Sequence, residues 1–189
     1  MSFTIETPRL ILQTSDVSLA PKLLNYYSKN RSFFEKYEPA NDDDYYTLSY
    51  QTNVLEHEVA NMERGISAYY YFFLKEDPDH IIGSMSFVRF RGEPYANTIF
   101  GYDLDEEHQG HGYCTEACKA AIENVKTYHN VHRFEARVQV DNKKSIKLLE
   151  RLDFWYEGIE RKSILLQGEF KDHFRYALLN DDYVISSEK

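Results

Sequence analysis

Two closely spaced glycines, Gly110 and Gly112, separate an apolar segment that ends near Leu104 from a segment with helical periodicity. The second segment predicts a helix over residues 114–127, because four apolar residues recur on one face: Ala117, Ala121, Ile122 and Val125. A helix start leaves backbone N–H groups unpaired and carries partial positive charge. Glycine lets the backbone approach a phosphate or take a positive φ. The junction indicates anion binding, although a glycine-rich turn that merely starts a helix explains the two glycines about equally well.

Two common nucleotide-binding loops do not fit the residues around these glycines. A Walker loop ends in Gly-Lys-Ser/Thr, and no such triplet follows here. A dinucleotide fingerprint needs a third glycine, but Thr115 stands at that position. The pattern that remains is Gln-x-x-Gly-x-small, which in this chain is Gln109-Gly110-His111-Gly112-Tyr113-Cys114.

This pattern resembles the pyrophosphate loop of the GNAT superfamily of N-acetyltransferases, which bind acetyl-CoA. The longer string over residues 109–117 is similar to the RimJ/RimL branch, which modifies the N-termini of ribosomal proteins. Residues 142–154 resemble the second signature of the family, and residues 7–12 resemble the opening strand of the same branch. The resemblance therefore extends over nearly the whole chain and is least specific between residues 20 and 67.

Two residues depart from the family pattern. Cys114 stands where the family usually has alanine or glycine, and its side chain is still small. Asp153 replaces a glycine, and aspartate tolerates left-handed backbone conformations better than most residues do. We expect the loop and the turn to persist with these residues.

The resemblance implies an α/β (α+β) GNAT fold, with a mixed, mainly antiparallel central sheet flanked by helices on both faces. Its central strands are expected to splay and admit acetyl-CoA. From the residues themselves, a helix that breaks at Asn30 and Arg31 is predicted first, and a second over residues 47–64. A strand over residues 3–13, interrupted by Pro8, opens the chain. Further strands are predicted over residues 68–75, 81–91, 96–104, 133–140, 155–166 and 170–179.

Composition limits the ligand and the location. The chain has 22 Lys and Arg against 31 Asp and Glu, so its net charge of −9 argues against nucleic acid and favours cationic substrates. No apolar run reaches the roughly 18 residues of a membrane span, and no secretory signal is visible. With two cysteines, we expect a cytoplasmic protein. We predict one domain over residues 1–182, a polar tail over residues 183–189, and a monomer or a homodimer.

The resemblance implies transfer of an acetyl group from acetyl-CoA to a primary amine by direct attack, without a metal. Ser145 matches a position near the CoA sulfur that donates a proton to the leaving thiolate. Asn142 matches a residue that hydrogen-bonds the pantetheine arm. By spacing alone, Ser145 is equally a first-turn serine and Asn142 a helix cap. The implied cofactor-binding residues are Tyr102, Leu104, Gln109, Gly110, His111, Gly112, Tyr113, Cys114, Thr115, Asn142 and Ser145.

The general base is less defined. An ammonium group must lose a proton before it can attack, and Asp103 is the candidate base beside the expected thioester, directly or through a water. Side chains alternate along a strand, so Asp103 can equally point away from the site. His108 is a second candidate. Ile164 stands where ribosomal-protein-specific members of the family place a catalytic glutamate.

The predicted acceptor is a protein N-terminal α-amine, by family resemblance. A small amine, such as a polyamine, amino sugar, amino acid or drug, is the alternative. A zinc-binding module is a competing hypothesis, because four metal-competent side chains lie within eleven residues: His108, His111, Cys114 and Cys118. Two of them lie inside the proposed phosphate loop, which argues against zinc. A CoA-binding protein without catalysis is the third hypothesis.

Overall fold

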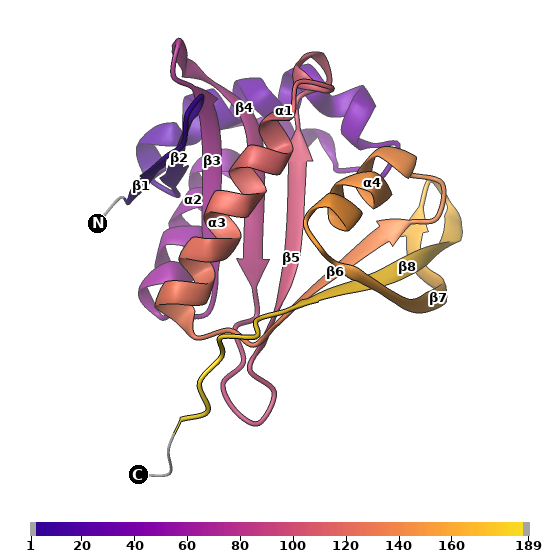
Figure 1. Ribbon diagram of the computed structural model, residues 1–189. Helices are drawn as coiled ribbons and strands as arrows, with labels where there is room; N and C mark the ends of the chain where they lie inside the picture. Colours follow the sequence, from indigo (N-terminus) through magenta and orange to yellow (C-terminus); the bar gives the residue numbers. More distant parts are fainter. Residues whose placement is uncertain (1–2, 187–189) are drawn as a thin grey trace.

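All the strands of the protein join one sheet in the computed structural model, which describes residues 3–186 (Figure 1). The strand order is β1 (Thr4–Glu6), β2 (Leu10–Thr14), β3 (Ala68–Leu74), β4 (Asp77–Val88), β5 (Asn97–Leu104), β6 (Arg133–Gln139), β8 (Glu169–Leu179) and β7 (Trp155–Leu166). Within the described residues the β5–β6 pair is parallel and every other neighbouring pair is antiparallel. The predicted mixed, mainly antiparallel sheet is confirmed.

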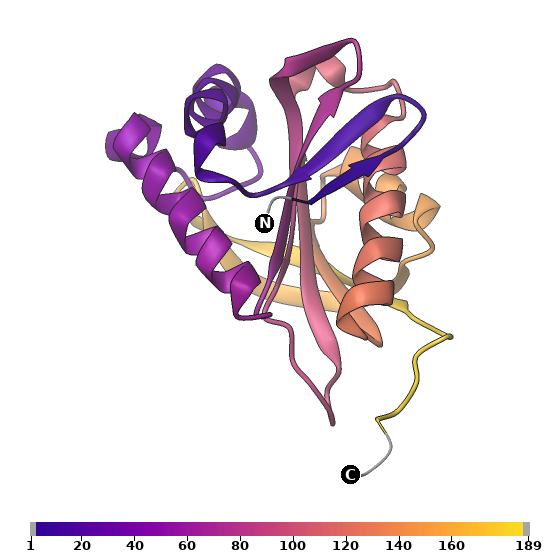
Figure 2. The same cartoon turned by 90° about the vertical axis from the view of Figure 1, so that its left-hand side faces the viewer.

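Helices cover both faces of this sheet, as the sequence predicts (Figure 2). One face carries α1 (Ala20–Phe34) and α2 (Leu48–Glu63), and the other carries α3 (Tyr113–His129) and α4 (Lys143–Arg151). Side chains alternate along a strand, so β3 supplies both cores and is apolar almost throughout. Tyr71 and Phe73 pack in the α1/α2 core, whereas Tyr70 and Phe72 pack in the larger α3/α4 core. Three short 3₁₀ segments complete the fold: η1 (Val17–Leu19), η2 (Asp43–Tyr46) and η3 (Glu106–His108).

The sheet opens between its two parallel strands. The ladder joins Asn97 to Arg133, Thr98 to Phe134 and Ile99 to Glu135. Beyond Ile99, β5 continues to Leu104 beside β4, while β6 turns away (Figure 1). The predicted splay of the central strands is therefore confirmed.

The predicted break of the first helix at Asn30 and Arg31 is wrong, since α1 continues to Phe34. Asparagine disrupts helices when its side chain competes for nearby backbone groups. Here the buried Asn30 amide donates to Tyr26 O at 2.9 Å and to Asp105 Oδ2 at 3.2 Å, so it ties the helix to the end of β5.

Several predicted boundaries move. The single opening strand is two strands, β1 and β2, which pair with each other around a turn at Pro8. The chain turns at Lys75 and Glu76, so β4 already begins at Asp77. The helix after the glycine loop is longer at both ends than predicted. Asp153 takes φ +62°, the left-handed conformation expected of it.

The described part of the predicted tail lies along the loop between β4 and β5. Tyr183 Oη and Ser186 N both donate to Glu93 Oε1, each at 2.7 Å. Residues 187–189 lie outside the described part of the chain. None of the described helices has the length and apolarity that a membrane span requires.

Candidate active site

The glycine loop has the backbone conformation that its sequence suggests. Gly110 and Gly112 have φ of +82° and +80°, and Gly112 is the N-cap residue of α3. A Cβ at Gly110 would meet nothing within 4 Å, and one at Gly112 would meet only Arg9 Nη2 at 3.5 Å. Backbone conformation, not lack of space, therefore requires glycine at both positions.

The N-terminal hairpin braces this loop from outside. Glu116, in the first turn of α3, accepts hydrogen bonds from Thr7 Oγ1 at 2.6 Å and from Arg9 N at 2.9 Å. Arg9 also donates to His111 O at 2.9 Å, and its guanidinium lies 4.6 Å from the centre of the Tyr113 ring. Burial raises the pKa of Glu116, but these hydrogen bonds and the Arg9 charge outweigh it and lower the pKa overall.

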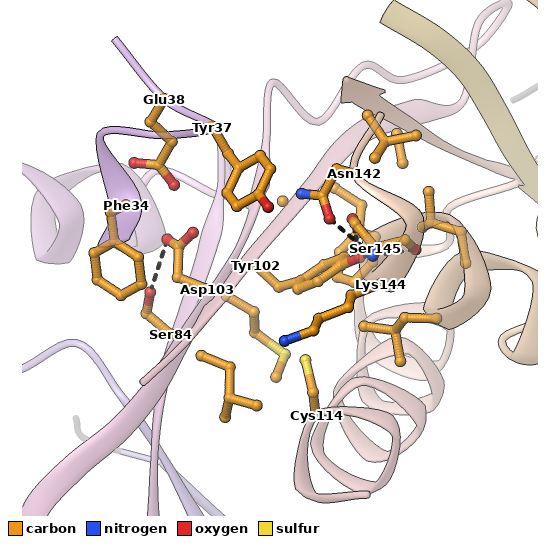
Figure 3. Close-up of a pocket in the computed structure, with 18 of the residues that line it drawn as sticks. Phe34, Tyr37, Glu38, Ser84, Tyr102, Asp103, Cys114, Asn142, Lys144 and Ser145 are labelled. Carbon is orange, nitrogen blue, oxygen red and sulfur yellow. Dashed lines mark hydrogen bonds between the residues drawn. The ribbon is translucent and has the colours of Figure 1, made fainter. Parts of the chain in front are cut away.

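Ser145 and Tyr102 meet where the sheet opens. Tyr102 points from β5 toward α4, and its hydroxyl is hydrogen-bonded to Ser145 Oγ. Asn142 caps α4, because its Oδ1 accepts from Ser145 N at 3.1 Å. The cap interpretation of Asn142 is thus confirmed, and its amide group still lies at the edge of the cavity (Figure 3).

A cavity of about 850 Å³ passes through the opening of the sheet and reaches both faces. Ten of the twelve predicted site residues line it: Tyr102, Asp103, Leu104, Gln109, Gly110, Gly112, Cys114, Thr115, Asn142 and Ser145. The other two, His111 and Tyr113, stack on each other with ring centroids 5.5 Å apart, and neither is among the described lining residues. The predicted residues, which span more than forty positions of sequence, are therefore brought together.

The residues around the loop suit a polyanionic ligand with an extended arm. Lys144 Nζ lies 2.6 Å from Gln109 Oε1, and Lys147 and Arg151 continue this positive edge of the cavity along α4. The β5 backbone beyond Ile99 faces the cavity rather than β6. An amide-bearing arm can pair with such a strand edge, and phosphates suit the α3 N-terminus.

Asp103 points to the α1/α2 side, opposite to Tyr102. Ser84 Oγ donates to Asp103 Oδ2 at 3.3 Å, and the Glu38 side chain points toward the same carboxylate from the turn after α1 (Figure 3). Burial and the neighbouring Asp103 raise the pKa of Glu38 to about 10. The position of Asp103 thus resolves the question left by strand alternation, because its side chain faces the cavity.

Sequence reasoning missed Glu38. It precedes Pro39 in a segment rich in aromatic residues, and nothing local marks it as functional. Glu58 of α2 was also missed. It accepts from Ser15 Oγ at 2.5 Å and from Tyr71 Oη at 2.8 Å, and burial raises its pKa to about 7 although these hydrogen bonds lower it. Both acids line the cavity on the α1/α2 side.

The predicted histidine and cysteine cluster does not assemble. Among residues 3–186, no three His, Cys, Asp or Glu side chains are placed to hold one metal ion. Cys118 is fully buried in the α3/α4 core, with its sulfur 3.9 Å from that of Cys114, and both thiols are free. His108 Nδ1 instead lies 3.4 Å from Asp105 Oδ1. The described residues therefore give the zinc hypothesis no geometric support.

Comparison with known proteins identifies the family. Residues 9–155 match the family described as "Acetyltransferase (GNAT) domain". The chain belongs to the GNAT acetyltransferases. This GNAT protein is 32% identical to the probable N-acetyltransferase YjcK of Bacillus subtilis (strain 168), over 88% of this chain and 92% of that protein. It is 29% identical to the ribosomal protein uS5-alanine N-acetyltransferase of Escherichia coli (strain K12), over 95% and 92% of the two chains.

A solved structure supports the same assignment. The ribosomal-protein-S5-alanine acetyltransferase from Vibrio fischeri superimposes with a TM-score of 0.93 at 27% identity, covering 97% of this chain and all of that one. The predicted GNAT fold and N-acetyltransferase class are confirmed, and this GNAT protein is an acetyl-CoA-dependent N-acetyltransferase with RimJ/RimL-type relatives.

Proposed function

We propose that this GNAT enzyme acetylates the α-amine of a protein N-terminus. One observation carries the proposal: consecutive residues of β5, Tyr102 and Asp103, point to opposite faces of the sheet where the cavity passes through it. A donor held on the α3/α4 face can then meet an amine that arrives from the α1/α2 face. The likeness to uS5-alanine acetyltransferases supports a protein N-terminus as the acceptor.

The donor site in this proposal is made of backbone and cations. The N–H groups of residues 109–115 hold the pyrophosphate, and the α4 cations support its charge. The β5 edge at Tyr102 and Leu104, with the Asn142 amide, holds the pantetheine arm. Acetyl-CoA supplies the thioester, whose acyl carbon is open to attack by an amine.

In this proposal, side chains at the opening of the sheet accept and donate the protons of the reaction. Asp103 accepts the proton that the acceptor ammonium loses, directly or through a water. The amine nitrogen then bonds the acyl carbon and the carbon–sulfur bond breaks. Ser145 gives its proton to the departing sulfur, and Tyr102, hydrogen-bonded to Ser145, stabilises the serine oxygen. The second nitrogen proton returns to the serine, so one proton is released to solvent per turnover.

The amine itself favours an N-terminus. An α-amine has an ordinary pKa of about 7.7–8.0, whereas a lysine or polyamine nitrogen has one near 10.4. At pH 7.5 roughly a third of the α-amine is neutral, against about 0.1% of the other. Deprotonation by a carboxylate base therefore costs much less free energy for an N-terminal α-amine than for a lysine or polyamine nitrogen.

A small polycationic amine is the second candidate, and Glu58 favours it. Tyr71, Ser84 and Asp103 lie opposite one another on adjacent strands, so Tyr71 is roughly 10 Å from Asp103 along this row. Glu58 accepts a hydrogen bond from Tyr71 at the far end of the row. A second positive charge of a diamine or polyamine fits such a second carboxyl group.

One assay separates these candidates. Purified enzyme is incubated with acetyl-CoA and matched acceptors at pH 7.5, and products are analysed by mass spectrometry. The acceptors are short peptides that begin with alanine or serine, the same peptides with a blocked N-terminus, and spermidine. We expect acetylation of the free N-termini only. Faster acetylation of spermidine than of every peptide would favour the second candidate instead.

A further inference from the structure

Two carboxyl groups meet in the α1/α2 half of the cavity. Asp103 extends from β5, and Glu38 extends from the turn after α1, where its backbone N–H donates to Phe34 O at 3.0 Å. The two side chains point toward each other in Figure 3, and Asp103 is, after burial, the group that raises the pKa of Glu38. A hydrogen bond between two carboxyl groups needs a proton on one of them, because an ionised carboxylate only accepts.

We infer that Glu38 and Asp103 form one proton-sharing pair that binds the ammonium group of the acceptor and takes its proton. The inference rests on the proposed function, because it names the acceptor subsite of that reaction. Its ligand class is a primary ammonium, whether an N-terminus or a small amine carries it.

The charge of the pair matches one ammonium. With the pKa of Glu38 raised to about 10 by burial and by Asp103, this glutamate keeps its proton near neutral pH, and the pair carries one negative charge. The protonated Glu38 orients Asp103, whose free oxygen can accept from the ammonium. Transfer moves one N–H proton to the pair, which later loses it to solvent.

Within the described residues, no cation is among the groups that shift the pKa of Glu38. The Lys and Arg residues among the described lining of the cavity come from β6 and α4: Arg137, Lys144, Lys147 and Arg151. Arg137 already pairs with Glu160, with Nε 2.8 Å from Oε2. Aromatic rings, whose faces attract cations, line the α1/α2 side: Tyr27, Phe33, Phe34 and Tyr37. A half-buried negative charge beside aromatic rings suits a cationic ligand.

A buried hydroxyl beside the pair points to the same conclusion. Tyr26 Oη lies near Ser84 without a well-formed hydrogen bond among the described residues. Burial is the main cause that raises the pKa of Tyr26, with smaller contributions from Asp103 and Glu38. The hydroxyl group of Tyr26 lies near that of Ser84, which donates to Asp103. An unpaired buried hydroxyl costs about 1–3 kcal/mol, so a ligand or a water at this point would relieve it.

The position of Ile164 adds an argument from chemistry. This residue lines the cavity where the family resemblance places a catalytic glutamate, and an isoleucine cannot hold a proton. Glu38 and Asp103, which line the same cavity, can supply the base that Ile164 cannot. On the side of the sheet that holds the pair, burial raises the pKa values of three tyrosines, so they stay neutral near pH 7: Tyr26, Tyr27 and Tyr45. Glu58 lines the same side, and burial raises its pKa to about 7.

The test compares wild type with Glu38→Gln, Asp103→Asn and the matched control Asp44→Asn. Asp44 is exposed in η2, so Asp44→Asn removes one carboxylate group, as Asp103→Asn does, without touching the pair. Acetyl-CoA binding is measured by calorimetry. The binding of alaninamide, and of N-acetylalaninamide as the uncharged probe, is measured on CoA-saturated protein. Carboxyl titration is followed by NMR of protein with ¹³C-labelled Asp and Glu.

We expect wild type and control to bind alaninamide equally, and Asp103→Asn to bind it at least tenfold more weakly. Glu38→Gln should bind it within threefold of wild type, because the neutral amide keeps the charge of the pair and can still donate to Asp103. Affinity for acetyl-CoA should stay within twofold in all variants, which also verifies folding. A carboxyl group that titrates above pH 8 should disappear in Glu38→Gln, and its midpoint should fall by more than one pH unit in Asp103→Asn.

Several results would overturn the inference: no alaninamide binding to wild type, unchanged affinity in Asp103→Asn, or a Glu38 titration midpoint that does not change in Asp103→Asn. Failure of wild type to bind acetyl-CoA would instead count against the proposed donor. The carboxyl titration does not depend on the donor, so it would still decide whether the two acids share a proton.

Discussion

Arg9 Nη2 lies 2.7 Å from Glu116 Oε2, which joins the start of the chain to the first turn of α3 beside the glycine loop. Arginine makes this contact with a planar fork, and lysine cannot reproduce its several directed hydrogen bonds. We expect Arg9→Ala and Arg9→Lys each to weaken acetyl-CoA binding about three- to tenfold, because the loop loses its brace. Calorimetry measures the affinity for acetyl-CoA. The control Lys22→Ala, which breaks an exposed ion pair with Asp79, should bind acetyl-CoA as wild type does.

The same ion pair makes the stability of the enzyme sensitive to acid. Hydrogen bonds and the Arg9 charge leave the pKa of Glu116 below its ordinary value despite burial. The stabilisation is therefore fully present above the ordinary glutamate pKa and is lost as the pH falls through the lowered one. Urea unfolding at pH 7 and at pH 3.5 should show a smaller acid-induced loss in Glu116→Gln than in wild type. Equal losses would contradict this role.

Gly112→Val should damage the loop through the backbone. A side chain at φ +80° costs about 1–2 kcal/mol, more when it is β-branched, and the N-cap of α3 would move. We predict at least a tenfold loss of acetyl-CoA affinity. Gly92→Val is the matched control, since Gly92 has open space around its Cβ position and does not take a positive φ. Unchanged affinity in Gly112→Val would show that the loop is not the anchor.

Ser145→Ala and Tyr102→Phe test the proton supply to the leaving sulfur. Each should lower kcat about 10- to 100-fold while acetyl-CoA affinity changes little, because the hydroxyls act on charge that develops during the reaction. The double variant should be hardly slower than either single one, since the two groups are hydrogen-bonded to each other. Steady-state kinetics with calorimetry separates the two effects, and strictly additive losses would argue against a shared role.

Glu58 should make the protein less stable as the pH rises. Its folded pKa of about 7 lies above the reference value of 4.5, because burial disfavours the charged form. The folded state then binds more protons than the unfolded state between these values, so stability falls from pH 4.5 to pH 7. Glu58→Gln keeps the acceptor for Ser15 and Tyr71 and should be more stable than wild type by about 1–3 kcal/mol at pH 8. Urea unfolding of both proteins at pH 5 and pH 8 measures the difference in stability. A difference that is the same at both pH values would contradict the prediction.

The parts of the site that could be predicted are those written in contiguous sequence. Gly112 and Asn142 lie in local motifs, and the conformation of each depends mainly on its neighbours, as a helix start and a helix cap. The role of Glu38 depends on how far α1 runs and on the register that sets Asp103 beside Ser84. The extent of α1 depends in turn on Asn30, whose partner Asp105 is 75 positions away. Helix propensity alone predicts that α1 ends at Asn30, so the break was predicted at the wrong place. The pair of Glu38 and Asp103 could therefore not be predicted from the sequence.

The three residue pairs between β5 and β6 have a mechanical consequence. These pairs connect the two halves of the sheet at one end only, so the two halves can change their relative orientation about this short connection. A ligand whose amides pair with the free edge of β5 fills the place of a missing strand and makes the sheet continuous. If the proposed donor site is correct, donor binding would make the fold more rigid, and release of CoA would require the two halves of the sheet to separate again.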